Sequence, residues 1–247
     1  MALSPTAFLV HQGDLHFTES ITNPVSTLIE SIWDSDHQFA RVITRNRIYF
    51  HQELYPICEG MLKVAAKRAT RLPFNEFLKH FQSEIENKSP VQHHHQSRFF
   101  ESPIPTPNSF RNIDHSMNFA MDLAKASNSS VGSILIDDHF NLLSWGWNDH
   151  FKNRVLHAEV MVIKNYLQHF KKKIPEKSLL ITTLQPCAMC AGYLHAYSED
   201  FSSLRIIFLK EDLGPFAQNS ILIPDSDLYK KSKLTKIPCQ SKHTKKP

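Results

Sequence analysis

The sequence has no run of apolar residues that approaches the ~18 residues of a membrane-spanning helix. It also has only 4 cysteines in 247 residues, too few for a chain held together by disulfides. No basic segment precedes the short apolar stretch near the start, MALSPTAFLVHQGD, so a secretory signal is not expected. Together these absences predict a reduced, cytoplasmic protein.

The remaining composition is that of an ordinary globular protein. Apolar residues make up 41% of the chain and charged residues 21%, and the length allows a sizeable core in one or two domains. The formal net charge of +4 is unevenly placed: residues 1–108 carry −1, residues 109–228 carry −2, and residues 229–247 hold seven lysines and no acid. Such a basic tail either contacts phosphates with little sequence preference or serves as a solubilising end.

Residues 1–90 are expected to form a small α+β domain. Two strand-like runs around Gln12-Gly13-Asp14 predict a hairpin, and residues 39–50 predict a second strand pair that turns at 45–47. Residues 57–70 and 73–87 predict two helices, the second with proline in its first turn. The sequence of this domain carries no catalytic signature.

Residues 91–109 predict a linker, because three prolines fall within five residues among serine and asparagine. The linker contains His93, His94 and His95. Two interpretations are open, a metal site or plain linker composition. The second is favoured, since three adjacent histidines in a flexible stretch rarely converge on one ion.

Residues 110–228 alternate between helical and strand-like periodicity. Helices are predicted at 112–126, 157–170 and 186–196, and strands at 131–136, 142–147, 178–183 and 204–209. This order predicts an α/β fold, in which a sheet has helices packed on both faces.

Two short motifs carry the chemistry, and each is predicted to open a helix. They are His157-Ala158-Glu159 and Pro186-Cys187-Ala188-Met189-Cys190. Zinc favours four tetrahedral ligands, and a catalytic site keeps one position for water. His157, Cys187 and Cys190 are expected to fill the other three. Cysteines three apart in a first helical turn point the same way, and the positive helix end favours thiolates.

Glu159 is expected to be the proton carrier, because it is near His157 without being a ligand. Zinc lowers the pKa of a bound water to about 7, and a carboxylate beside it can move protons to a ring nitrogen and a leaving amine. This is the chemistry of hydrolytic deamination. The structural alternatives are a redox pair or a four-ligand zinc knuckle completed by His195 or Cys239, and the joint presence of both motifs favours catalysis.

These motifs resemble the cytidine-deaminase-like superfamily, and within it the tRNA adenosine deaminase branch, over roughly residues 112–215. The similar stretches read SVGSILI, GWN, HAEV and TTLQPCAMCAG. The resemblance implies a three-layer α/β/α fold, one Zn²⁺ per chain and a nucleobase substrate, with a homodimer or a heteromer both open. It also implies that Asn148 holds the target base or its sugar, the alternative being a turn residue, and that Ala158 contacts the substrate.

The sequence departs from the family pattern at three places. Gln185 stands where glutamate is usual, and residues 191–204 are longer than usual, which is expected to change a wall near the pocket. Residues 1–108 match nothing in the compact bacterial tRNA enzymes. An added N-terminal domain resembles the non-catalytic partner subunit of the eukaryotic tRNA deaminase, but that subunit typically lacks the glutamate present here as Glu159. We therefore expect a competent enzyme.

Three functions are weighed. The first is zinc-dependent deamination of a base in a nucleic acid, adenosine in tRNA or cytosine in RNA or DNA, which the branch resemblance and the basic tail favour. The second is deamination of a free base or nucleoside such as guanine or cytosine, which the acidic balance of residues 109–228 favours. The third is a non-catalytic nucleic-acid-binding or partner subunit, against which Glu159 argues. Four aromatic residues could stack on bases or belong to the core: Trp145, Trp147, Phe151 and Phe216.

Overall fold

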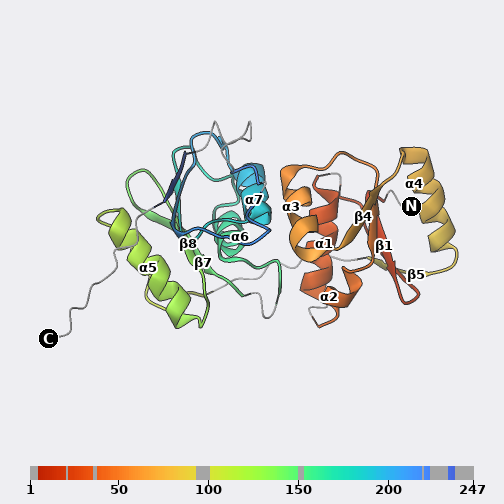
Figure 1. Cartoon of the computed structure of the whole chain (residues 1–247), viewed down its shortest axis with the longest axis horizontal. Coiled ribbons are helices and arrows are strands. Elements are labelled where there is room, and N and C mark those ends of the chain that lie inside the picture. The colour runs from red at the N-terminus through yellow and green to blue at the C-terminus, as the bar shows by residue number, and fades with distance from the viewer. Residues whose placement is uncertain are drawn as a thin grey trace.

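The computed structural model describes residues 5–20, 22–35, 38–92, 101–149, 153–218, 220–222 and 233–236. Its elements form two five-stranded sheets, with helices between them and on their outer sides (Figure 1). Within these residues, no helix is long and apolar enough to cross a lipid bilayer.

The first sheet belongs to an N-terminal unit, which we define as residues 5–92. Its strand order is β4-β3-β1-β2-β5. The predicted hairpin is confirmed, with Gly13 in its turn at a φ of 96°. The elements of the unit are β1 (Ala7–His11), β2 (Asp14–Thr18), α1 (Pro24–Ser35), α2 (Ala40–Ile43), β3 (Arg47–Phe50), α3 (Pro56–Ala65), β4 (Arg68–Arg71), α4 (Phe74–Ile85) and β5 (Ser89–Gln92).

Two predictions for the N-terminal unit are wrong in part. Residues 39–50 do not form a strand pair, because α2 replaces the first strand and buries Ala40 and Ile43 at helical spacing. The helix predicted at 57–70 ends at Ala65, and residues 68–71 instead form β4, parallel to β3. Helix α1 was not predicted from the sequence, whereas the helix predicted at 73–87 is confirmed as α4.

The predicted linker is shorter than residues 91–109. Its first two residues belong to β5, which pairs in parallel with β2. At its other end, Ile104 packs against a hydrophobic cluster that contains Phe110, and Ser109 forms a bridge to Asn141. The histidines 93–95 lie outside the described residues.

The second sheet has the strand order β10-β9-β8-β6-β7. The predicted order of helices and strands from residue 110 is confirmed, each element within two residues of its expected bounds. The elements are α5 (Ile113–Ala126), β6 (Gly132–Ile136), β7 (Leu142–Trp147), α6 (Ala158–Phe170), β8 (Leu179–Leu184), α7 (Ala188–Tyr197), β9 (Arg205–Lys210) and β10 (Lys233–Lys236). Strand β10 was not expected, because residues 229–247 were predicted to be a basic tail. It pairs in parallel with β9.

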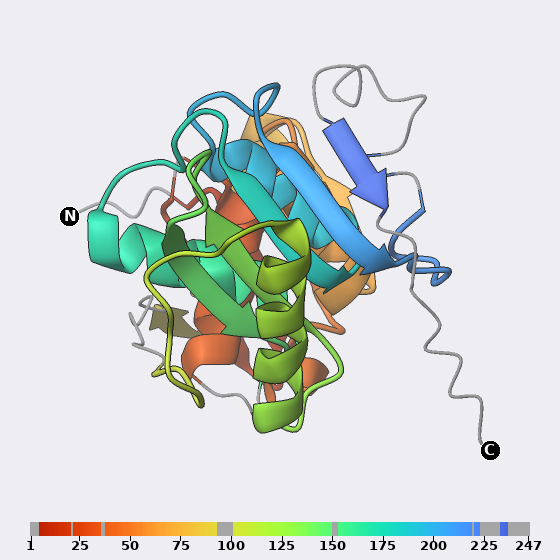
Figure 2. The ribbon, with the colours of Figure 1, turned by 90° about the vertical axis from the view of Figure 1, so that its left-hand side faces the viewer.

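Strand alternation sorts this sheet into three layers. Ile134 and Ile136 of β6 point into a cluster with α5, whereas Leu135 between them points into the core shared by α6 and α7. In β8, Ile181 and Leu180 divide between the two clusters in the same way. Figure 2 shows α5 in front of the sheet. The predicted three-layer α/β/α arrangement is confirmed.

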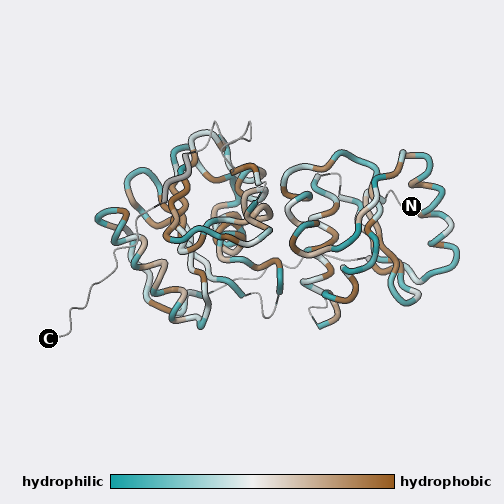
Figure 3. The backbone as a smooth tube through the Cα atoms, in the orientation of Figure 1, coloured by the Kyte–Doolittle hydropathy of each residue, from teal (hydrophilic) through white to brown (hydrophobic). Residues whose placement is uncertain are grey.

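Helix α7 is the centre of the molecule. Every residue from Ala188 to Leu194 is buried, because α3 and α6 pack on the helix and Leu180 of β8 and Ile206 of β9 share its hydrophobic cluster. Figure 3 shows hydrophobic stretches in the helices on both sides of the boundary between the two halves of the molecule. One hydrophobic cluster accordingly contains Ile57 and Met61 of α3 together with Met189 and Leu194 of α7. The two sheets therefore share a core, and their division into separate domains stays a prediction.

Two glycines allow α3 and α7 to approach closely. A Cβ atom on Gly192 would lie 2.5 Å from Ile57 Cα, and one on Gly60 would lie 2.5 Å from the Ala188 carbonyl oxygen. Contacts this short do not occur between real Cβ atoms and their neighbours, so each helix supplies a residue without a side chain where the other crosses it.

A buried polar cluster joins α1 to the second half of the chain. Glu30 of α1 accepts a hydrogen bond from the Tyr193 hydroxyl and forms an ion pair of 2.9 Å with the Lys164 ammonium. The side chains of Lys164 and Glu30 are only 16% and 11% exposed. A pair shielded to this degree is stabilising only while both partners are present.

Replacing Glu30 with alanine is therefore expected to lower the free energy of unfolding by about 3–5 kcal/mol, because it leaves the Lys164 ammonium buried without a counter-charge. Denaturant titration of the purified protein measures the change. The matched control is Lys125→Ala, which removes an exposed pair with Asp122 and should cost at most about 0.5 kcal/mol. Equal losses for the two variants would contradict the buried pair's role.

Candidate active site

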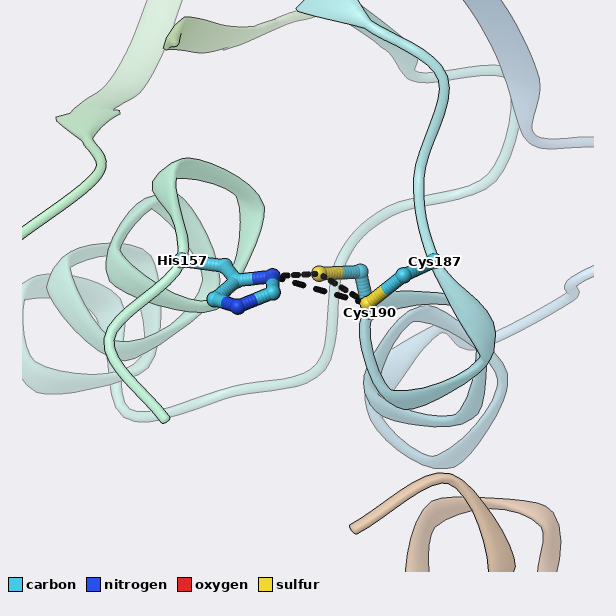
Figure 4. Close-up of side chains that lie close together, drawn as sticks. All are labelled: His157, Cys187 and Cys190. Carbon is cyan, nitrogen blue, oxygen red and sulfur yellow. Dashed lines mark hydrogen bonds between the residues drawn. The ribbon is translucent and has the colours of Figure 1, made fainter. Parts of the chain in front are cut away.

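His157, Cys187 and Cys190 meet where two helices begin (Figure 4). His157 is the N-cap residue of α6, and Cys187 is the N-cap residue of α7. The three distances between His157 Nδ1, Cys187 Sγ and Cys190 Sγ are each 3.5 Å. The structure thus brings together the side chains that the two sequence motifs single out.

A triangle of this size fits a tetrahedral zinc ion. Zinc–sulfur bonds of about 2.3 Å and zinc–nitrogen bonds of about 2.0 Å place neighbouring tetrahedral ligands about 3.5–3.8 Å apart. One imidazole and two thiols are also a donor set that zinc prefers. In the described part of the chain, this is the one group of at least three such side chains close enough to share a metal ion.

The four-ligand alternative gains no support from His195. Its ring packs on Phe201 with centroids 5.3 Å apart, and it does not belong to the triangle. Cys239 lies outside the described residues. The described residues therefore supply three ligands, as the open zinc site of an enzyme requires.

The two thiols differ in their pKa. The hydrogen bond from Cys190, with His157 beside it, holds the pKa of the Cys187 thiol well below its usual value. Burial instead raises the pKa of Cys190 well above its usual value. For His157, burial lowers the pKa, but the hydrogen bond and charge of Cys187 outweigh it and the net direction is upward. A bound divalent cation would favour the thiolate form at both cysteines.

Glu159 lies in the first turn of α6 and is 3% exposed. Its Oε1 accepts a hydrogen bond of 3.3 Å from the Thr182 hydroxyl, and its Oε2 lies 3.3 Å from Cys190 Sγ. Burial raises the pKa of this carboxyl, although the charge of His157 opposes the shift. The carboxyl therefore lies beside the ligand triangle, in a position to bind and release a proton.

A small pocket opens onto the triangle and Glu159. Asn148 and Ala158 line it, and the substrate contacts expected for them stay predictions. The backbone N–H of Asn148 donates to Val131 O and to Ser129 Oγ, which fixes the residue at the end of β7. Its side-chain oxygen, Oδ1, is buried and has no hydrogen-bond partner. Such an oxygen is an acceptor that a ligand in the pocket can satisfy.

Four further residues line the pocket that the sequence reading did not assign to it: Val131, Leu184, Gln185 and Asp212. Asp212 is the most informative, because it adds a carboxylate to the wall. Its Oδ1 accepts a hydrogen bond of 2.8 Å from Gly214 N, and the loop is anchored by a bond of 2.8 Å from Ala188 N to Phe216 O. Asp212 follows the carboxyl end of β9, where open α/β sheets bind ligands, and this rule could have found it.

Two expectations about the surroundings of the pocket change. Residues 191–204 do not contribute to its lining among the described residues: Phe201 packs into the core, and Ser202 and Ser203 line a separate depression. Of the aromatic candidates, Trp145 packs against the cluster with α5, so its role is in the core. Phe151 lies outside the described residues.

Comparison with known proteins agrees with this site. Residues 124–230 match the family model of the Bd3614-like deaminases. The chain is 33% identical over 82 residues to the tRNA-specific adenosine deaminase of Haemophilus influenzae, which covers 31% of this chain and 47% of that protein. The chain thus spans about half the length of the curated relative that it matches.

Solved structures of deaminases resemble the fold more distantly. The guanine deaminase of Nitrosomonas europaea aligns with a TM-score of 0.44 and 16% identity, over 58% of this chain and 91% of that one. The dCMP deaminase of cyanophage S-TIM5 aligns with a TM-score of 0.37 and 20% identity, over 51% and 96%.

The region around the site therefore resembles deaminases in sequence, and among them the tRNA adenosine deaminase branch. The resemblance predicted from the sequence motifs is confirmed.

Replacing Cys187 with alanine should abolish stoichiometric zinc binding, because two ligands remain where the site needs three. Metal analysis of the purified protein measures zinc per chain. The control is Cys58→Ala, which removes a buried thiol outside the triangle and should leave zinc bound. Full zinc occupancy in the Cys187 variant would overturn the ligand assignment.

Proposed function

We propose that this protein is a zinc-dependent hydrolytic deaminase that acts on a nucleobase within a nucleic acid, adenosine in tRNA or cytosine in RNA or DNA. One observation carries the proposal: three zinc-type ligand atoms lie 3.5 Å apart beside a buried carboxylate, at the base of a small pocket. The match to a deaminase family supports it.

His157, Cys187 and Cys190 would hold the ion. When bound, zinc supplies a Lewis acid that activates a water molecule. Glu159 would take a proton from this water as the water oxygen adds to the amino-bearing carbon of the base. The carboxyl would give that proton to the ring nitrogen and would then carry the proton of the newly added hydroxyl to the amino group. The carbon–nitrogen bond breaks and ammonia leaves, so atoms and charges balance.

The pocket walls orient the base for this reaction. The unpartnered Asn148 Oδ1 accepts a hydrogen bond from an N–H or O–H group of the substrate. Ala158 is the first residue of α6, so its backbone N–H has no acceptor within the helix and is free to donate to a substrate atom at the start of α6. The buried Thr182 hydroxyl holds Glu159 toward the ligand triangle.

Two observations favour a polymeric substrate. The relative from Haemophilus influenzae is a tRNA-specific adenosine deaminase, and it is 33% identical to this chain over 82 residues. The segment 229–247 carries seven lysines and no acid, which suits a phosphate backbone.

A free base or nucleoside is the second candidate, and Asp212 favours it. A carboxylate in the pocket wall accepts hydrogen bonds from N–H groups of a base, but repels a nearby phosphate.

A non-catalytic subunit is disfavoured, because the Glu159 carboxyl lies beside the ligand triangle, where a proton carrier is needed. A homodimer, a heteromer and a cytoplasmic location all stay predictions.

Glu159→Gln is expected to lower turnover by at least about 10²–10⁴-fold, because the amide cannot carry protons. Zinc content should stay that of the wild type, since Glu159 is not a ligand. The assay sequences cellular nucleic acids after expression of each variant and scores A-to-G and C-to-T changes. Glu176→Gln changes an exposed glutamate and serves as the control. Unchanged editing by the Glu159 variant would exclude its role.

A variant with five tail lysines replaced by glutamine tests whether the substrate is a nucleic acid. The positions replaced are Lys230, Lys231, Lys242, Lys245 and Lys246. These positions spare β10, so the sheet is kept intact. RNA affinity should fall, and the log–log salt dependence should flatten by about 0.7–0.9 for each phosphate that the tail no longer neutralises. Turnover of a free nucleoside serves as the control and should not change. If the variant and the wild type have the same RNA affinity and the same salt dependence, the assignment changes to a free base or nucleoside as the substrate.

A further inference from the structure

The N-terminal unit lies directly behind the turn that carries the two cysteine ligands. A Cβ atom on Gly60 of α3 would be 2.5 Å from both the Ala188 carbonyl oxygen and Met189 Cα. These two residues separate Cys187 from Cys190, so the backbone between the ligands rests on α3. The cysteine turn cannot shift toward the N-terminal unit without a collision.

The same unit also reaches the segment that leads to the histidine ligand. Asn153 is 2% exposed and donates a hydrogen bond of 3.4 Å from Nδ2 to Asp34 Oδ1 of α1. The side-chain oxygen of Asn153 accepts from Val155 N, and its carbonyl accepts from Leu156 N. Asn153 therefore shapes the tight turn that delivers His157, and α1 holds it in place.

The histidine ligand and the two cysteine ligands are thus both positioned by contacts with the N-terminal unit. His157 comes with α6 and the cysteines come with α7, so the distances of 3.5 Å between them require the two helix starts to keep a fixed separation. The helices α1 and α3 pack on each other through Ser26 and Cys58, whose polar atoms lie 3.8 Å apart. The Glu30 cluster adds a third tie, because it touches both α6 and α7.

We infer that Gly60 and Asp34 of the N-terminal unit are positioning residues for the metal centre, and that the unit sets the geometry of the zinc ligands. This inference rests on the proposed zinc site. It assigns to the N-terminal unit a task in the chemistry itself, although none of its described residues lines the pocket. A side chain at Gly60 pushes the cysteine turn away from α3 and changes its distance to His157.

The test uses the full-length chain reloaded with cobalt(II), which takes zinc's tetrahedral ligands and absorbs visible light according to its geometry. Gly60→Ala should weaken cobalt affinity by about 10–100-fold, the range seen when groups that orient metal ligands are removed. It should also alter the absorption spectrum of the bound ion. The control is Phe77→Leu, which disturbs the buried cluster beneath α4, on the far side of the first sheet.

A second pair of variants keeps the test decisive if Gly60→Ala folds poorly. Asp34→Ala should weaken cobalt affinity in the same direction, and the exchange of partners, Asp34→Asn with Asn153→Asp, should restore it. Variants that lose stability like Phe77→Leu but keep wild-type cobalt affinity and spectrum would overturn the positioning role. A wild-type chain that binds no cobalt would instead overturn the zinc site, so the two failures are distinguishable.

Discussion

Two helix starts must meet for this site to exist. His157 and Cys187 are N-cap residues of α6 and α7, and their ligand atoms are 3.5 Å apart although 30 residues separate them in the chain. Both helices follow strands or loops at the same end of one sheet, so their positive ends converge. That convergence favours thiolates and the Glu159 carboxylate at one point. This partial positive charge opposes the effect of burial, which raises the pKa of Glu159 and of Cys190.

The centre of the second sheet could be predicted from sequence because its signals are local. The apolar run of β6 alternates between two hydrophobic layers, and Pro186 marks a helix start in the same stretch as the cysteines. Ligand identity follows from the chemistry of histidine and cysteine at that spacing, without knowledge of the fold. The structure then adds the distances of 3.5 Å between the three side chains.

The rest could not be predicted, because it depends on neighbours and not on local pattern. Strands β4, β5 and β10 have four residues each and are polar or proline-containing, so only pairing with a neighbouring strand identifies them. The short apolar segment at 39–50 fits a strand or a helical turn equally well, and burial of Ala40 with Ile43 decides for the turn. Asp212 is an intermediate case: its place after the carboxyl end of β9 could have marked it as a candidate, but only the loop anchored on α7 shows that it lines the pocket.

The shared core has a consequence for how such a protein can change over evolutionary time. Helix α7 is buried from Ala188 to Leu194, so it offers no exposed face along which the N-terminal unit could be exchanged for another. Removing that unit would expose the apolar side of α7 on which α3 packs, and any substitute would have to reproduce the paired glycines of the crossing. The two halves are therefore bound to evolve together, as one inherited piece.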